Sequence, residues 1–233
     1  MRLSSANIWD PLESNIADQE ILSSAKKREI KNILKSYVGT YDPISELIQN
    51  AMDAIERRIE NEESDKFSPK VIIKINIKEN SFEVTDNGCG FELAEFKAFL
   101  APNISFKDNN KTRGNKGVGA TYIAYGFNDL YMKTGNNSFK FEGIFKNGRN
   151  WVDDTAGRVP RPKIEQIKSG NNNEIFQGTT FKIYFGGKGT RPKDLGWYQA
   201  NTANQWLYIL LTKTPLGHIS LPGLEPDPKV FQA

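Results

Sequence analysis

Three oxygen-bearing side chains share one side of a stretch that has the periodicity of an amphipathic helix. In residues 44–58, Glu46, Asn50 and Asp53 fall within one narrow sector at about 100° per residue, and the apolar residues fall opposite. Two carboxylates and an amide stacked one above another could hold a hydrated cation and activate a water molecule. The alternative is the solvated face of a surface helix.

A second candidate for chemistry follows an expected strand at residues 81–85. Asp86 ends this strand and is followed by Gly88 and Gly90, which flank one residue. Glycine permits positive φ and a close approach of a ligand to the backbone. A plain glycine turn, with Asp86 as a turn residue, is the alternative.

A third candidate is the glycine-rich run that contains Gly114, Lys116, Gly117, Val118 and Gly119 and leads into an apolar segment. A glycine-rich loop that opens a helix favours phosphate, because free N–H groups and the helix dipole point at the anion. The spacing matches neither a Walker A loop nor a dinucleotide fingerprint. The alternative is a flexible loop before a helix.

These candidates need helices and strands to position them. Asp42 is expected as N-cap of the helix that carries Glu46, with Pro43 as its first residue. Residues 101–116 are expected to form a mobile loop or lid, and residues 146–173 a basic excursion with a strand near Trp151. The other expected helices are 18–37, 92–100 and 197–212, and the expected strands are 71–77, 81–85, 130–134, 139–145 and 178–185.

Composition narrows the class of protein. The chain has 233 residues, of which 38% are hydrophobic and 14 are Phe, enough for the core of one large domain. A net charge of +3 gives no strong whole-chain field toward nucleic acid or membrane. The lone Cys89 excludes an internal disulfide framework and a cysteine-based zinc site. No run of about 18 apolar residues is present, so we expect a soluble, cytoplasmic protein.

Four motifs in a fixed order closely resemble the GHKL ATPase superfamily of gyrase-type topoisomerases, ninety-kilodalton heat-shock chaperones, sensor histidine kinases and MutL. They are E-x-x-x-N-A-x-D-A from Glu46, D-N-G-x-G from Asp86, G-x-x-G-x-G from Gly114 and G-T at Gly178. The resemblance covers residues 42–185. It implies an α+β fold, a two-layer α/β sandwich with a mixed, mostly antiparallel sheet and helices on one face (the Bergerat fold), with ATP between the layers.

The resemblance also implies roles for the helix residues. Glu46 corresponds to the general base that deprotonates the attacking water, and Asn50 to the protein ligand of Mg²⁺. Asp53 resembles a residue that lines the adenine end or supports Asn50 through water.

Further roles implied by the resemblance concern the nucleotide itself. Asp86 corresponds to the acceptor for the adenine amino group, which would select adenine over guanine, and Thr179 to a hydroxyl that shares a water with it. Gly88 and Gly90 would let the backbone approach the base. The phosphate cradle would be formed by Lys116, Gly117, Val118 and Gly119. Lys107, Lys111 and Arg113 are other candidates for the γ-phosphate contact.

The branch of the superfamily is a hypothesis. Glu46 favours ATP hydrolysis over transfer to a protein histidine, and related branches use ATP to close a dimer, with residues 1–16 as an arm that could cross to a second subunit. A DNA-acting ATPase subunit and a non-hydrolysing nucleotide switch stay open as alternatives. We expect a strap and helix at 1–41, the ATP-binding core at 42–190, and a helical extension at 191–233 that leads to a further domain.

Overall fold

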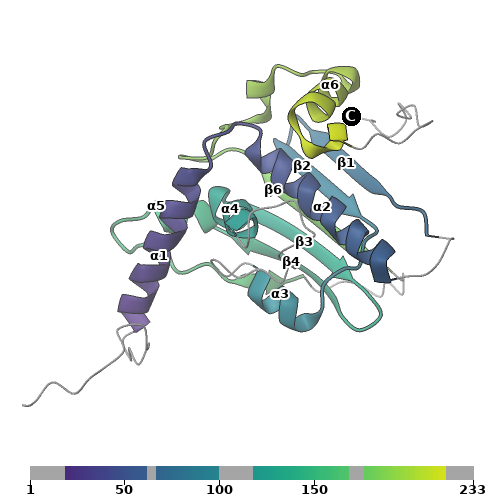
Figure 1. Ribbon diagram of the computed structural model, residues 1–233. Coiled ribbons are helices and arrows are strands. Elements are labelled where there is room, and N and C mark those ends of the chain that lie inside the picture. Colours follow the sequence, from purple (N-terminus) through teal and green to yellow (C-terminus); the bar gives the residue numbers. More distant parts are fainter. Residues whose placement is uncertain (1–18, 62–66, 100–117, 168–175, 219–233) are drawn as a thin grey trace, which may run out of the picture.

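The elements form two layers, a six-stranded sheet and helices packed over one of its faces (Figure 1). The structure is a computed structural model, and it describes residues 19–61, 67–99, 118–167 and 176–218. The helices are α1 (Gln19–Ser36), α2 (Asp42–Asn61), α3 (Leu93–Phe99), α4 (Val118–Gly126), α5 (Gly148–Asp153) and α6 (Ala203–Lys213), with 3-10 turns η1 (Leu195–Tyr198) and η2 (Pro215–His218). The strands are β1 (Val71–Asn76), β2 (Ser81–Asp86), β3 (Asp129–Gly135), β4 (Lys140–Lys146), β5 (Ile164–Gln166) and β6 (Gly178–Tyr184).

The strand order is β1-β2-β6-β3-β4-β5, and each of its neighbouring pairs is antiparallel. The prediction of an α+β fold with two layers is therefore confirmed. The sheet was expected to be mixed. In the described residues it is antiparallel in every pairing, so the expected parallel element is not present there.

Strand register places residues of β2, β6 and β3 in three rows on the face toward the helices. Two rows are apolar and fill the core, and the third is polar. The rows are Phe82, Ile183 and Leu130; then Val84, Phe181 and Met132; then Asp86, Thr179 and Thr134. Because side chains alternate along a strand, residues between these positions, such as Glu83 and Lys182, lie on the other face.

Helix α2 packs on the apolar rows. Ile44, Leu47 and Ile48 are at most 1% exposed and belong to the same core cluster as Phe82 and Leu130. The expected N-cap, Asp42, is the first residue of the helix, so the helix begins one residue earlier than expected. The Asp42 carboxylate accepts the Gly39 N–H at 2.8 Å and so fixes the preceding turn.

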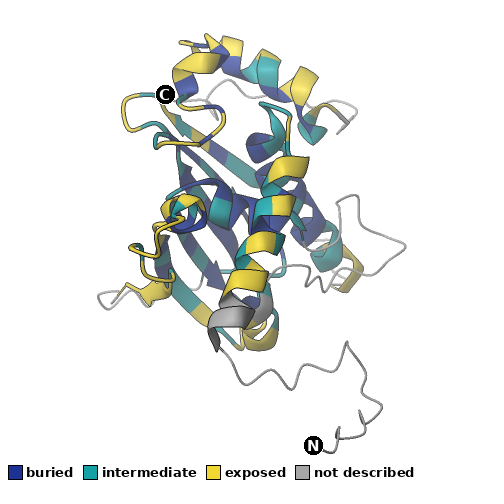
Figure 2. Ribbon diagram, turned by 90° about the vertical axis from the view of Figure 1, so that its left-hand side faces the viewer, coloured by how far each residue is buried: buried dark blue, intermediate teal, exposed yellow. Residues whose placement is uncertain are grey.

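Figure 2 shows the buried residues concentrated on the strands and on the sides of the helices that face them. Helix α1 continues this layer by packing on α4 and α5. Ile30, Trp151 and Val152 form a second, smaller apolar cluster between α1 and α5. This cluster fixes the position of α5 against the longer helix.

Two expectations about the later chain are wrong. The strand expected near Trp151 is helix α5, which buries Trp151 and Val152, and the short strand in this region is β5 instead. The helix expected at 197–212 is divided into η1 and α6. Gln199 adopts a left-handed conformation (φ 54°), and extended Thr202 starts α6 with a capping box to Gln205.

The other expected elements are confirmed to within a few residues, including α1, α2, α3 and the hairpin between β1 and β2. The arm at 1–16 and the lid at 101–116 lie outside the described residues. Among the helices that are described, none combines the length and apolar character needed to cross a membrane.

Candidate functional site

The helix motif meets the glycine-rich motif at Glu46. A Cβ added to Gly119, in the first turn of α4, would overlap Glu46 Oε2, so a larger residue there would push this carboxylate out of its position. The Tyr37 hydroxyl donates to Glu46 Oε1 at 2.9 Å, and the Tyr37 ring stacks on Tyr122 of α4 with centroids 4.0 Å apart. Tyr37, Glu46 and Gly119 are called the helix end below.

Tyr37 is held as a hydrogen-bond donor. Burial raises the pKa of the Tyr37 phenol above its usual range, and the negative charge of Glu46 raises it further. The phenol therefore keeps its proton at neutral pH. It constrains one oxygen of Glu46 while Gly119 borders the other.

The helix motif also meets the motif after β2. The Cys89 N–H donates to the Ala54 carbonyl at 3.1 Å, and a Cβ at Gly88 would lie 2.5 Å from the Ala54 carbonyl carbon. Gly90 has φ +68°, as expected for a glycine turn. Gly88 is thus required by the contact between α2 and the end of β2, a structural reason that needs no ligand.

The motif after β2 meets the Gly-Thr motif of β6. Asp86 Oδ1 accepts the Gly88 N–H at 2.8 Å and the Thr179 N–H at 3.2 Å. Gly178 has φ +123°, and a Cβ there would overlap the Asp86 carbonyl oxygen. The Thr179 hydroxyl lies 3.3 Å from the Thr134 hydroxyl. Asp86, Thr134 and Thr179 are called the sheet end below.

The carboxyl group of Asp86 is buried, with only 5% of the residue exposed. Burial raises its pKa to about 7, and the bonds from Gly88 and Thr179 oppose that rise. Both of its hydrogen bonds from other described residues fall on Oδ1. Oδ2 is therefore the oxygen that a ligand donor can use. With a pKa of about 7, the Asp86 carboxyl group is present in both its protonated and its ionised form near neutral pH.

Asn50 and Asp53 continue from Glu46 along α2. Asp53 is only 2% exposed, and its Oδ1 accepts from the Gln49 side chain at 2.6 Å. Glu46 and Asn50 are half-buried. A solvated helix face would leave these residues exposed, so that alternative is wrong. The polar side of α2 instead faces the interior of the molecule.

Sequence reasoning missed three residues of this region. Thr134 could have been found, because alternation along β3 puts it on the same face as Leu130 and Met132. Gln49 lies one helical turn before Asp53, on the same side. Tyr37 carried no signal, since its contact with Glu46 depends on how α1, α2 and α4 pack.

Part of the predicted phosphate cradle falls outside the described residues. Lys116 and Gly117 lie in the undescribed segment, as do Lys107 and Lys111. Val118 and Gly119 are the first two residues of α4, so the predicted helix after the glycine-rich run is confirmed. In the described residues no group of three or more His, Cys, Asp or Glu side chains could hold a metal ion.

Comparison with known proteins adds no relative. No protein-family model matches the chain, and no curated protein sequence matches it.

Proposed function

We propose that this chain binds Mg²⁺-ATP and hydrolyses it, as a GHKL-type ATPase domain with a Bergerat fold. The observation that carries the proposal is that the motifs meet in space. The helix motif contacts the glycine-rich motif at Glu46 and the D-N-G-x-G motif at Ala54, and the latter contacts the Gly-Thr motif at Asp86. Residues far apart in sequence thus come together along α2, at Glu46 near its start and at Ala54 further along.

The sheet end supplies a group for recognising adenine. A buried carboxylate whose Oδ1 is held by two backbone amides presents Oδ2 to a donor. The exocyclic amine of adenine is such a donor, whereas guanine has a carbonyl at that position. A buried acceptor that is left unpaired, or that meets another acceptor, costs more than the bond itself gains. We therefore expect strong preference for ATP over GTP.

The helix end supplies a group for hydrolysis. Glu46 would take a proton from water as the water oxygen attacks the γ-phosphorus, and the bond from that phosphorus to the ADP oxygen breaks. Tyr37 and Gly119 fix the position of the carboxylate that does this. The product is ADP and inorganic phosphate, with the water proton held on Glu46 before release.

The residues of α2 fit Mg²⁺ better than a metal that needs several protein ligands. Asn50 offers one amide oxygen on the same side of α2 as Glu46, and Mg²⁺ typically keeps several waters and binds substrate phosphates. When bound, the ion would neutralise phosphate charge. Asn50 is the residue we assign to hold it.

The experiment that tests the proposal is calorimetric titration of ATP and GTP with Mg²⁺ into wild type and Asp86→Asn. We expect ATP to bind wild type, GTP to bind at least about a hundredfold more weakly, and Asp86→Asn to lose ATP binding, because its amide presents a donor to the adenine amine. Asp129→Asn is a matched control and should bind ATP normally. Unaltered ATP binding by Asp86→Asn would refute the assignment.

A further inference from the structure

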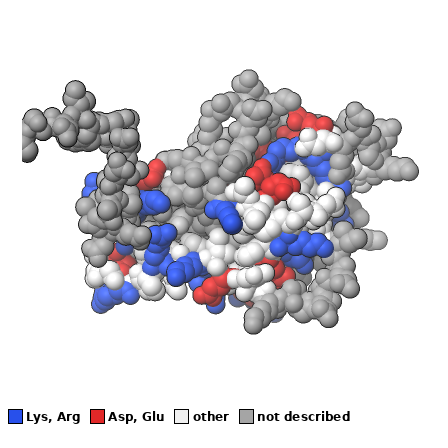
Figure 3. Space-filling view, turned by 90° about the horizontal axis from the view of Figure 1, so that it is seen from below, with Lys and Arg blue, Asp and Glu red and all other residues white. Residues whose placement is uncertain are grey.

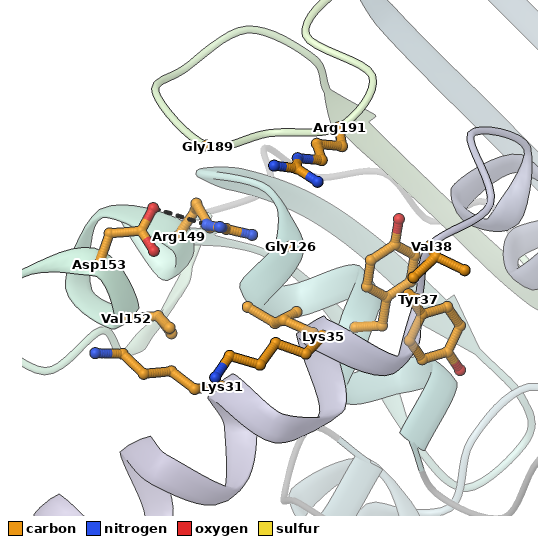
Figure 4. A pocket seen from close by; sticks show the side chains of 12 residues that line it. Lys31, Lys35, Tyr37, Val38, Gly126, Arg149, Val152, Asp153, Gly189 and Arg191 are labelled. Carbon is orange, nitrogen blue, oxygen red and sulfur yellow. Dashed lines mark hydrogen bonds and ion pairs between the residues drawn. The ribbon is translucent and has the colours of Figure 1, made fainter.

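A cavity of about 360 Å³ lies between α1, α4, α5 and the loop after β6 (Figure 4). Its size falls within the range of about 300–1,000 Å³ that is usual for small-molecule sites. Only Tyr37 is shared with the helix end of the proposed nucleotide site. The lining residues are Lys31, Leu34, Lys35, Tyr37, Val38, Tyr122, Gly126, Arg149, Val152, Asp153, Gly189 and Arg191.

Cationic side chains dominate the polar part of this lining. Figure 4 shows the ammonium groups of Lys31 and Lys35 on the side of α1 and the guanidinium groups of Arg149 and Arg191 on the opposite side. The carboxylate among the lining residues, Asp153, is paired with Arg149 at 2.8 Å. The lining therefore has a clear excess of positive charge.

The remaining cations of the cavity are not neutralised by neighbours. Among the residues that the structure describes, Lys31, Lys35 and Arg191 form no ion pair. Like charges around one space repel one another, and an anion placed between them would relieve this repulsion. Lys31 is half-buried, so its charge is screened less by water than that of an exposed lysine.

The walls of the cavity are fixed by contacts of their own. Lys27 of α1 donates to the carbonyl of Asp154, just after α5, and lies over the Trp151 ring at 5.1 Å from its centroid. A Cβ at Gly189 would lie 2.6 Å from Asp153 Oδ2, so the loop after β6 sits directly on the Arg149–Asp153 pair. These contacts fix α1, α5 and the loop after β6 relative to one another, so the walls that carry the cations are in place before any ligand arrives.

The same positive character extends over the neighbouring surface. Helix α1 also carries Lys26, Lys27 and Arg28. In the view from below, Lys and Arg side chains predominate toward the side of the molecule where α1 lies (Figure 3). An anion approaching this side would be attracted toward the cavity.

We propose that this cavity binds a phosphate-bearing ligand. Arginine guanidinium groups match phosphate in a bidentate geometry, and two lysines add point charges suited to a multiply charged group. The apolar side chains of Leu34 and Val152 and the Tyr37 and Tyr122 rings would contact the organic part of the ligand. The phosphate could belong to a small phosphate ester or to a nucleic-acid backbone, and the test distinguishes these sources.

The test titrates pyrophosphate, and separately a short DNA duplex, into the full chain by calorimetry. Lys35→Ala/Arg191→Ala removes two exposed cations of the cavity, and Lys78→Ala/Lys140→Ala removes two exposed cations elsewhere, with the same change in net charge. We expect wild type to bind pyrophosphate, the cavity variant to bind it at least about tenfold more weakly, and the control variant to stay within about twofold. Lys35→Ala alone should show a smaller loss.

The outcomes separate the possibilities. Binding of the duplex with the same dependence on the cavity pair, and no binding of pyrophosphate, would assign the site to a nucleic-acid backbone. Binding of neither probe, or equal losses in both double variants, would overturn the proposal. Because calorimetry of pyrophosphate requires no ATP turnover, failure of the ATPase assignment would leave this result interpretable.

Discussion

The sheet end and the helix end of the proposed nucleotide site are positioned by different kinds of contact. At the sheet end, strand register and backbone amides fix Asp86, and Gly178 closes the space behind it. At the helix end, Glu46 is fixed by a tyrosine hydroxyl and by a glycine on another helix. Backbone pairing is insensitive to side-chain identity, whereas side-chain contacts change with each helix shift. We therefore expect ATP binding to tolerate substitutions of the residues around Asp86, and ATP hydrolysis to be lost more readily when the residues around Glu46 are substituted.

The largest effect that separates the two ends is expected for Glu46→Gln. The amide keeps the size of the side chain but cannot accept the proton of the attacking water, so kcat for ATP hydrolysis should fall by about 10²–10⁴ while ATP affinity changes little. Turnover assays and calorimetric titration measure the two quantities. Glu56→Gln, further along α2, is the control. A variant that lost ATP affinity as well would show that the two ends are not separable.

The second prediction concerns the pH dependence of stability at the sheet end. Burial raises the folded-state pKa of Asp86 to about 7, above the value of about 3.9 for an unfolded chain. Between these values the folded state binds the extra proton. The contribution of Asp86 to stability is therefore fully present below pH 4 and is lost as pH rises toward 7.

Comparison with Asp86→Asn isolates this contribution, because the other titrating groups cancel. The free energy of unfolding of the variant minus that of wild type should increase between pH 4 and 7, by at most about 1.4 kcal/mol per pH unit. Chemical denaturation across this range measures it. A difference that is constant with pH would mean that Asp86 is not held in the environment described.

Glycine-to-alanine substitutions compare the ends directly. At Gly88 the added methyl would meet the backbone of Ala54, which cannot yield, so Gly88→Ala should lower the free energy of unfolding by about 1–3 kcal/mol. At Gly119 it would meet the mobile tip of Glu46. Gly119→Ala should therefore keep its thermal stability and lose most ATP turnover. Equal stability losses in the two variants would contradict the comparison.

The sequence predicted the sheet end better than the helix end. The hairpin of β1 and β2, the strand β6 and the glycine turn follow from alternation and turn residues, which are local features. The alignment of Asp86 with Thr179 depends on the pairing of β2 with β6, which the structure supplies. The motif resemblance supplied Glu46 and Gly119 as separate residues, but their contact depends on how α2 and α4 pack.

Features that depend on packing between distant helices could not be predicted. Tyr37 reaches Glu46 only because α1 lies against α4, and the cavity needs α1, α5 and the loop after β6 together. Helix α5 was missed because its six residues begin at glycine and carry too few turns for a helical period. Its stability comes from burying Trp151 and Val152 against α1.

The smallest expected effect tests whether Tyr37 positions Glu46. Tyr37→Phe removes the hydroxyl that donates to Glu46 Oε1 and keeps the ring that stacks on Tyr122. The carboxylate should then lose part of its fixed orientation, so kcat should fall by about three- to tenfold with an unchanged KM for ATP. The free energy of unfolding should change by no more than about 1.5 kcal/mol.

A second tyrosine offers a matched control for Tyr37→Phe. Tyr131 donates to Glu142 Oε1 at 3.0 Å between neighbouring strands, away from α2. Tyr131→Phe removes the same atom and the same kind of bond, so a purely structural role predicts similar changes in both variants. A fall in kcat confined to Tyr37→Phe would assign the hydroxyl to positioning Glu46. Equal kcat values in the two variants would mean that the Tyr37 hydroxyl does not position Glu46.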